Sequence, residues 1–227
     1  MKLSIIIPVF NEKNTIQKLI EKVRELDIKK EIIIVDDGST DGTGKILKGY
    51  PQNADFKIFF HPKNKGKGSA IKTALSNVTG EVVVIQDGDL EYEPSDLLEL
   101  LKPISENKAE VVYGSRLLYF KNDKSYLRYF FGGKLLTFLA NILYNAKLTD
   151  ESTCYKMFKT DVLKNLNFKS NGFGFCPEVT AKIRKKGIHI FESPIHYTPR
   201  KIKQGKKIRW KDGLEAIWIL LKYRFID

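Results

Sequence analysis

The sequence has few cysteines and histidines and no long apolar run. Its two cysteines, Cys154 and Cys176, form no Cys-x-x-Cys pair. This spacing argues against a disulfide scaffold or a zinc ribbon and is typical of a reducing compartment. The three histidines show no metal-ligand spacing, so we expect them to be structural. No segment approaches the roughly 18 consecutive apolar residues of a membrane span, and Met1 leads into a strand-like run rather than a signal peptide.

Several nucleotide-site and catalytic motifs are absent as well. No Gly-x-Gly-x-x-Gly follows the first expected strand, as dinucleotide-binding folds require. The P-loop pattern fails because position 61 is His and Gly68 follows Lys67. There is also no Gly-x-Ser-x-Gly elbow. These absences argue against dinucleotide-binding enzymes, P-loop nucleoside triphosphatases and α/β-hydrolases.

Charge is plentiful but unevenly placed. The 227 residues include 39 basic and 27 acidic residues, a net charge of +12. The stretch from Lys182 to Lys211 contains eleven basic residues and one acidic residue, Glu192, and so carries +10. Such a concentration points to an anionic partner, which is a nucleic acid, a phospholipid surface or a phosphorylated ligand. The hydrophobic share of 42% is enough for the core of a single domain spanning 1–227.

The first half of the chain alternates apolar runs with amphipathic segments. We expect a helix after Asn14, which can cap it, and another over Ser95–Glu106. The expected strands are Leu3–Val9, Glu31–Val35, Lys57–Phe60, Glu81–Ile85 and Glu110–Tyr113. This alternation predicts an α/β fold with a mostly parallel sheet, helices on both faces, and ligands at the carboxyl ends of the strands.

The second half is less regular. Tyr126–Asn145 has the pattern of a helix with clustered Phe and Leu, which either packs on the sheet or lies at a membrane interface. A loop-rich stretch follows. The final helix begins near Trp210, and we expect its Trp218 and Leu221 to belong to the core.

Acidic residues come directly after two of the expected strands. Asp36 and Asp37 follow the second strand, and Asp87 and Asp89 follow the fourth. Carboxylates one residue apart at a strand end can share Mg²⁺ or Mn²⁺ and leave positions for phosphate oxygens. The alternative is a turn whose aspartates cap the next helix. An EF-hand does not fit, because its sixth position would be Tyr92 rather than glycine.

Five short motifs follow one another along the chain: IPVFNE at 7–12, VDDGSTDGT at 35–43, NKGKG at 64–68, QDGDLE at 86–91 and GSR at 114–116. In this order they resemble glycosyltransferase family 2, and among its members the dolichol- and polyprenyl-phosphate sugar synthases. The resemblance covers nearly the whole chain. It implies the glycosyltransferase A-type nucleotide-sugar-binding fold, with 1–116 as the nucleotide-sugar-binding half and 117–227 as the acceptor-binding half.

The resemblance also implies a donor site and a metal. Mg²⁺ or Mn²⁺ would be held on the donor diphosphate by Asp87 and Asp89, with Glu91 as a further ligand. Gly88 stands where the family commonly has Ala, a change we expect to be harmless. The implied donor-binding residues are Pro8, Phe10, Asn11, Glu12, Asp36, Lys67, Asp87, Gly88 and Asp89.

On the acceptor side the resemblance implies a cluster of cations. Asp89, Arg116 and Asp150 are the implied catalytic residues, with Asp150 near the acceptor as the base if one is needed. Asp150 as a cap before the following loop is the alternative. The candidate ligands of the acceptor phosphate are Arg116, Arg128, Arg200, Lys206 and Lys207.

The implied reaction is inverting transfer of a sugar from a UDP- or GDP-sugar to a polyprenyl or dolichyl phosphate. An anionic phosphate acceptor needs no strong base, so catalysis would rest on alignment and charge stabilisation. We expect a cytoplasmic enzyme in peripheral contact with an anionic membrane. Two alternatives are transfer to a glycan or protein hydroxyl, which needs a base, and a non-catalytic nucleic-acid binder. Neither the sugar nor the base is indicated.

Overall fold

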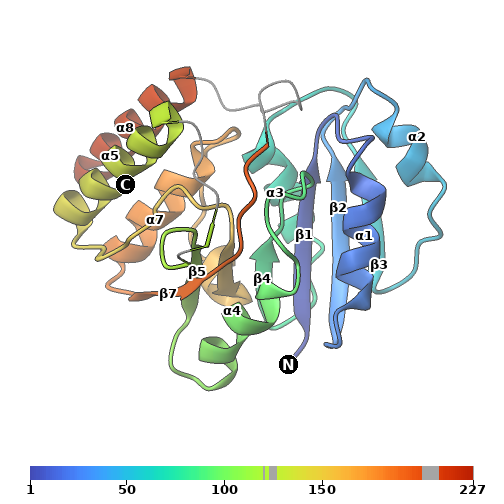
Figure 1. Cartoon of the computed structure of the whole chain (residues 1–227), viewed down its shortest axis with the longest axis horizontal. Helices are drawn as coiled ribbons and strands as arrows, with labels where there is room; N and C mark the ends of the chain where they lie inside the picture. Colours follow the sequence, from blue (N-terminus) through green and yellow to red (C-terminus); the bar gives the residue numbers. More distant parts are fainter. Residues whose placement is uncertain (120, 123–126, 201–209, 227) are drawn as a thin grey trace.

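A single seven-stranded sheet forms the centre of the molecule (Figure 1). The computed structural model describes residues 1–119, 121–122, 127–200 and 210–226, without the side chains of 127–128. β6 is antiparallel to its neighbours β4 and β5, whereas β1 to β4 are parallel to one another. The strand order is β3 (Phe56–Phe60), β2 (Lys30–Asp36), β1 (Leu3–Val9), β4 (Val82–Ile85), β6 (Lys156–Lys159), β5 (Val111–Ser115) and β7 (Ile190–Pro194).

Helices cover both faces of this sheet. One face carries α1 (Ile16–Glu25), α2 (Thr43–Lys48) and α4 (Asp96–Ser105). The opposite face carries α3 (Lys67–Leu75), α5 (Leu127–Tyr144), α6 (Thr160–Lys164), α7 (Phe175–Lys185) and α8 (Trp210–Phe225).

The central strands are apolar without interruption because both of their faces are buried. In β1, Ile5 and Ile7 contribute to the core beneath α1 and α4, whereas Ile6 faces the core beneath α3. All three side chains are fully buried, and each contributes about 1.5–3 kcal/mol relative to exposure. Burial of these strands fixes the directions in which their carboxyl-end loops leave the sheet.

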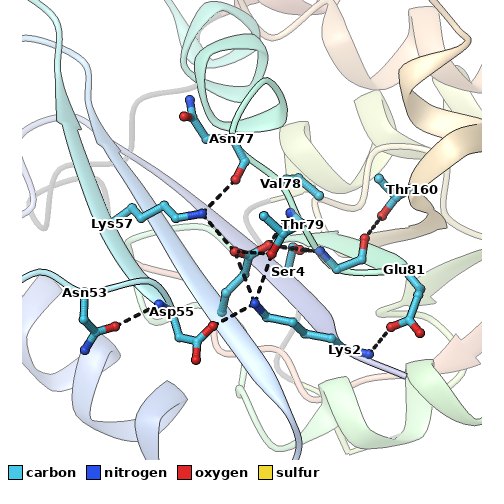
Figure 2. A network of polar contacts seen from close by, with 12 residues as sticks. Lys2, Ser4, Asn53, Asp55, Lys57, Asn77, Val78, Thr79, Glu81 and Thr160 are labelled. Atoms are coloured by element: carbon cyan, nitrogen blue, oxygen red, sulfur yellow. Dashed lines mark hydrogen bonds and ion pairs between the residues drawn. The ribbon is translucent and has the colours of Figure 1, made fainter.

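A buried carboxylate joins the amino ends of the central strands. Glu31 at the start of β2 accepts hydrogen bonds from Ser4 Oγ at 2.5 Å and from the Thr79 amide at 2.6 Å. Lys57 Nζ lies 3.2 Å and Lys2 Nζ 3.7 Å from Glu31 Oε2 (Figure 2). Burial would raise the pKa of Glu31, but these hydrogen bonds lower it to about 2. This network is structural and lies at the end of the sheet away from the carboxyl-end loops.

Some sequence expectations need correction. Asn14 does not cap the first helix: α1 begins at Ile16 with Thr15 at its N-cap position and no side-chain cap bond. Trp218 and Leu221 do not belong to the core, because their exposed fractions are 63% and 39%. The α8 sequence is apolar on two faces. The face opposite Trp218 and Leu221 is the buried one, and it consists of Ala216, Ile219, Leu220 and Tyr223.

β6, α6, α7 and β7 were not expected from the sequence, which predicted loops over most of that region. The helix expected over Tyr126–Asn145 is present as α5 over Leu127–Tyr144, and one side of it packs against α7 and α8. Tyr126 lies outside the described residues. Within the described residues, no helix is both long enough and apolar enough to cross a membrane.

Candidate active site

The loops that follow β1 and β2 are tied together at the carboxyl edge of the sheet. The Asn11 amide donates to Ser39 Oγ, and the Thr40 amide donates to Asn11 Oδ1, both at 2.8 Å. The Glu12 amide donates to Thr43 Oγ1 at 2.8 Å. Asn11 has a positive φ of 53°, a conformation that asparagine tolerates better than most residues. These bonds place the Glu12 side chain before any ligand arrives.

Asp36 and Asp37 at the end of β2 have different surroundings. Asp36 lines a pocket of about 370 Å³ between the loops that follow β2 and β3. Asp37 instead accepts hydrogen bonds from the amides of Lys65 at 2.9 Å and Gly66 at 2.7 Å, and its Oδ1 lies 2.6 Å from His61 Nδ1. Asp37 therefore shapes the loop before α3, whereas the equally buried Asp36 lines the pocket.

The pocket beside Asp36 combines a carboxylate, two lysines and an aromatic ring. Of the predicted donor residues only Asp36 lines it, whereas Pro8 and Phe10 are partly exposed at the end of β1. Its full lining is Asp36, Gly38, Ser39, Thr40, Gly42, Gly44, Lys45, Lys48, Phe60, His61 and Pro62.

Four acidic side chains meet where β1 and β4 end. We call Glu12, Asp87, Asp89 and Glu91 the carboxylate cluster. Lys67 at the start of α3 forms an ion pair with Asp87. Thr15 Oγ1 joins the loops by donating to Glu12 Oε2 at 2.7 Å and lying 2.8 Å from the Gly88 carbonyl.

Arg200 contacts three members of the carboxylate cluster. Its Nη1 lies 3.0 Å from Glu12 Oε2, its Nη2 lies 3.0 Å from Asp89 Oδ2, and its Nε lies 3.6 Å from Glu91 Oε1. The Arg200 side chain is 14% exposed. We expected Arg200 on the acceptor side, but the structure places it directly on the predicted metal ligands.

Burial and mutual repulsion alter the ionisation of the cluster. Burial, followed by the negative charge of Asp87, raises the pKa of Asp89 to about 7, whereas Arg200 opposes this shift. When all four carboxylates are ionised and only the cations of the described residues are counted, Lys67 and Arg200 leave the cluster with a net charge of −2. That deficit equals the charge of one divalent cation.

The carboxylate cluster fits Mg²⁺ or Mn²⁺ by its chemistry, since both metals prefer carboxylate oxygens. Arg200 Nε is buried without a hydrogen-bond acceptor, so the guanidinium satisfies the site incompletely. Among the described residues, no three acidic, His or Cys side chains are already arranged as a ligand set. Asp87, Asp89 and Glu91 would therefore have to exchange protein cations for the metal, with phosphate oxygens completing its coordination.

Arg116 and Asp150 form a second charged unit after β5. Arg116 Nε donates to Asp150 Oδ2 and Nη2 donates to Oδ1, both at 2.7 Å, and the Arg116 amide adds a bond of 3.1 Å. Burial alone would raise the pKa of Asp150, but the Arg116 charge and its hydrogen bonds bring it below the ordinary value. Asp150 is therefore a poor base in this state.

Aromatic rings connect the carboxylate cluster to this ion pair. Tyr92, which follows Glu91, stacks on Tyr155 with ring centroids 4.7 Å apart and contacts Tyr197 at 5.5 Å. The Arg116 guanidinium lies over the Tyr197 ring at 5.1 Å. Sequence reasoning missed all three tyrosines, although the position of Tyr92 directly after QDGDLE could have indicated it.

Asn122 was also missed, and no sequence pattern marks it. Its side-chain amide donates to the carbonyl of Arg116 at 2.8 Å and to that of Ile195 at 2.7 Å. Its Oδ1 accepts from the Tyr197 amide at 2.7 Å. Asn122 thus holds the Arg116 loop against the chain that leads from β7 to Arg200.

The structure brings most of the predicted site residues together. Glu12, Lys67, the Asp87–Glu91 loop and Arg200 form one group, with the Arg116–Asp150 pair beside it. A Cβ on Gly88 would meet Glu12 Cγ at 3.4 Å and Val9 Cγ2 at 3.5 Å, which is ordinary contact. Lys206, Lys207 and the side chain of Arg128 lie outside the described residues.

Comparison with known proteins agrees with this geometry. Residues 4–166 match glycosyl transferase family 2. A UDP-N-acetylglucosamine–dolichyl-phosphate N-acetylglucosaminyltransferase of Methanococcus voltae is 28% identical, over 90% of this chain and 89% of that protein. A low-salt glycan biosynthesis hexosyltransferase of Haloferax volcanii is 30% identical over 87% of this chain, which spans only 48% of that longer protein.

A solved structure shares the fold. Glucosyl-3-phosphoglycerate synthase from Mycobacterium tuberculosis, crystallised with Mn²⁺, UDP and phosphoglyceric acid, superposes with a TM-score of 0.74 at 20% identity. The match covers 100% of this chain and 79% of that chain. The family match overturns the alternative of a non-catalytic nucleic-acid binder. The chain belongs to glycosyl transferase family 2, and it is a glycosyltransferase with the A-type α/β fold.

Proposed function

We propose that this glycosyltransferase transfers a sugar, with inversion, from a UDP- or GDP-sugar to a polyprenyl or dolichyl phosphate, using Mg²⁺ or Mn²⁺. The observation that carries the proposal is the pairing of two charged units. One is an acidic group in which the carboxylates outnumber the described cations placed on them, and the other is an arginine whose carboxylate partner is a poor base. The first suits a metal-bound diphosphate, and the second suits an acceptor that is already anionic.

On the donor side, the pocket beside Asp36 would take the nucleoside, with Pro8, Phe10 and Asn11 at its neighbouring edge. Lys67 lies in the first turn of α3 and on Asp87, where its ammonium group would meet the diphosphate. A divalent metal held by Asp87, Asp89 and Glu91 would supply positive charge to the leaving diphosphate. Lys67 and Arg200 would have to move off these carboxylates for the metal to bind.

On the acceptor side, Arg116 would bind the lipid phosphate. With Nε and Nη2 bonded to Asp150, the remaining N–H groups on Nη1 and Nη2 would donate to the phosphate oxygens. Asp150 would then orient Arg116 rather than accept a proton. The acceptor phosphate attacks the anomeric carbon as an anion, and the diphosphate leaves from the opposite side.

The names of the relatives support this acceptor class. The Methanococcus protein is a dolichyl-phosphate glycosyltransferase by name, and this chain spans most of its length. We also propose that 1–227 acts as one catalytic domain, with 1–116 binding the donor and 117–227 the acceptor. Contact with the membrane would be peripheral, at the cytoplasmic face, so that a lipid-borne phosphate reaches Arg116.

Donor binding is tested by thermal shift with UDP- and GDP-sugars, with and without Mn²⁺. Saturating the correct nucleotide sugar with Mn²⁺ should raise the melting temperature by about 5 °C. Asp89→Asn should remove the Mn²⁺-dependent part of the shift, whereas Asp27→Asn, on the surface after α1, should keep it. If no nucleotide sugar stabilises the folded protein, the donor assignment is wrong.

Transfer to a hydroxyl acceptor makes a different prediction at Asp150. If Asp150 were the base, Asp150→Asn would abolish turnover at every pH. In the proposed reaction the asparagine Oδ1 still accepts a hydrogen bond from Arg116, so turnover falls only moderately and its pH profile keeps its shape. Initial rates from pH 5 to pH 9 distinguish the two.

A further inference from the structure

α5 exposes an apolar face to solvent. Phe131, Leu135, Phe138 and Ile142 are 64%, 48%, 58% and 64% exposed. Their spacing of four, three and four residues puts them in one stripe along the helix. The other side of α5 is also apolar and is buried in the core, for example at Ala140. A helix that is apolar all round is expected to be covered on both sides.

α8 repeats this pattern. The exposed fractions of its outward residues are 71% for Trp210, 57% for Leu214, 63% for Trp218, 39% for Leu221 and 83% for Phe225. Steps of four, four, three and four residues again define one stripe. Ordinary protein surfaces carry exposed apolar residues singly, whereas this stripe brings two tryptophans and a phenylalanine together.

The two helices are neighbours at one side of the molecule (Figure 1). Tyr144 Oη donates to the Leu220 carbonyl at 2.5 Å, so the helices touch beside Ile142 and Trp218, which are both exposed. No described residue covers either stripe. We call the two stripes together the apolar face.

Charge indicates what covers the apolar face. α5 contains no acidic residue, and α8 contains three basic and two acidic residues. The sequence directly before α8, from 200 to 209, contains six basic residues and no acidic one. In a symmetric dimer the same patch meets itself, so these like charges would be brought together. An anionic bilayer attracts such charges instead, and exposed tryptophans favour the membrane interface.

The apolar face also lies beside the acceptor side of the site. Thr137 on the buried side of α5 accepts a hydrogen bond from the Glu151 amide at 3.0 Å, directly after Asp150. A Cβ on Gly133 would lie 3.0 Å from Ser152 Oγ. α5 thus supports the loop that holds Asp150 and Arg116 while its opposite stripe faces solvent.

We propose that the exposed stripes of α5 and α8 dock this protein on an anionic lipid bilayer, with the Arg116–Asp150 pair turned toward lipid-borne phosphate. Docking itself follows from the apolar face and its charges. Only the delivery of a phosphate acceptor rests on the proposed function. Burial of the two stripes at the level of the headgroups supplies the apolar part of the affinity, and the basic residues supply the electrostatic part.

The test is co-sedimentation of the full chain with vesicles that contain no polyprenyl phosphate. The protein should bind to vesicles of phosphatidylcholine with phosphatidylglycerol. Its binding should be weaker to pure phosphatidylcholine vesicles, and weaker to the anionic vesicles at high salt. The double variant Phe138→Glu with Trp218→Glu should bind at least about tenfold more weakly. Phe191→Glu is the matched control, since Phe191 is 41% exposed on β7, outside the apolar face. It should bind as the unchanged protein does.

Two results would overturn the proposal: equal binding of the double variant and the unchanged protein, or no binding to anionic vesicles. Light scattering after size exclusion gives a third. If the unchanged protein is a dimer that does not bind vesicles, and the double variant is a monomer, the apolar face joins two copies of the chain. Circular dichroism and nucleotide binding confirm that the double variant is folded.

A water-soluble short-chain isoprenyl phosphate separates this proposal from the proposed function. The double variant should keep turnover with this acceptor and lose turnover with the vesicle-borne one. Vesicle binding without turnover on either acceptor would refute the proposed acceptor and leave the docking surface standing.

Discussion

At the scale of single residues, Arg200 balances the carboxylate cluster and competes with a metal for it. Its guanidinium occupies oxygens of Glu12, Asp89 and Glu91 that a divalent cation would need. Removing the Arg200 guanidinium would make the cluster more negative and would release the carboxylate oxygens that it contacts. Metal affinity and the position of Arg200 are therefore linked.

Arg200→Gln should tighten Mn²⁺ binding in the absence of nucleotide on the order of tenfold, about 1.4 kcal/mol. The paramagnetic resonance signal of free Mn²⁺ measures this affinity without any turnover. Lys18→Gln, an equal loss of charge on the exposed side of α1, should leave it unchanged. Unchanged or weaker binding in Arg200→Gln would contradict the competition.

Two glycines near the site differ in what they tolerate. Gly88→Ala adds a Cβ at ordinary contact distance, so the free energy of unfolding of the protein should change by less than about 0.5 kcal/mol. Gly38→Ala should lose roughly 2 kcal/mol or more, because Gly38 has a φ of +75° and its Cβ would lie 2.5 Å from the Lys63 carbonyl carbon. Urea unfolding of both variants checks the contrast, and equal losses would contradict it.

At the scale of elements, Glu31 joins β1, β2 and β3 at their amino ends. Its folded-state pKa of about 2 lies below the ordinary value of 4.5. The ionised carboxylate therefore stabilises the fold fully above about pH 4.5 and progressively less as pH falls toward 2.

Glu31→Gln should destabilise the protein at pH 7, and its difference from the unchanged chain should shrink as pH falls from about 4.5 toward 2. Urea unfolding at several pH values measures this difference. Glu25→Gln on the exposed side of α1 should show almost none. A difference that stays constant with pH would show that the charge of Glu31 does not matter.

The first four strands could be predicted from the sequence because each is a mostly apolar run bounded by turn residues. β6 could not be predicted in the same way, since two of its four residues are lysines. Lys156 is nevertheless buried, and its Nζ donates a hydrogen bond to the Glu151 carbonyl. β7 shows little alternation at the edge of the sheet. In α8 the periodicity identified two apolar stripes but could not decide which one faces the core.

The candidate site could be predicted where a short motif places residues at a strand end. That reasoning found Glu12, Lys67 and the Asp87–Glu91 loop. It could not place Arg200, because contacts across more than a hundred residues depend on where the chain after β7 returns. Asn122 and Tyr197 were missed for the same reason.

At the scale of the whole molecule, the proposed donor side, the proposed acceptor side and the apolar face follow one another across the structure. In the sequence, positive charge is concentrated from 182 to 211, from the last turn of α7 to the first turn of α8. A membrane beneath the apolar face would place the basic residues of α8 near anionic headgroups. The same orientation would bring a lipid phosphate toward Arg116.

The central claim is that the acceptor is a lipid phosphate and not a hydroxyl. The most direct measurement incubates the protein, Mn²⁺ and the stabilising radiolabelled nucleotide sugar with polyprenyl phosphate, and separately with the polyprenol of the same chain length. The account predicts a lipid-extractable labelled sugar with the phosphate and none with the alcohol. Labelled product from the alcohol alone, or from neither lipid with folded protein and bound donor, would contradict it.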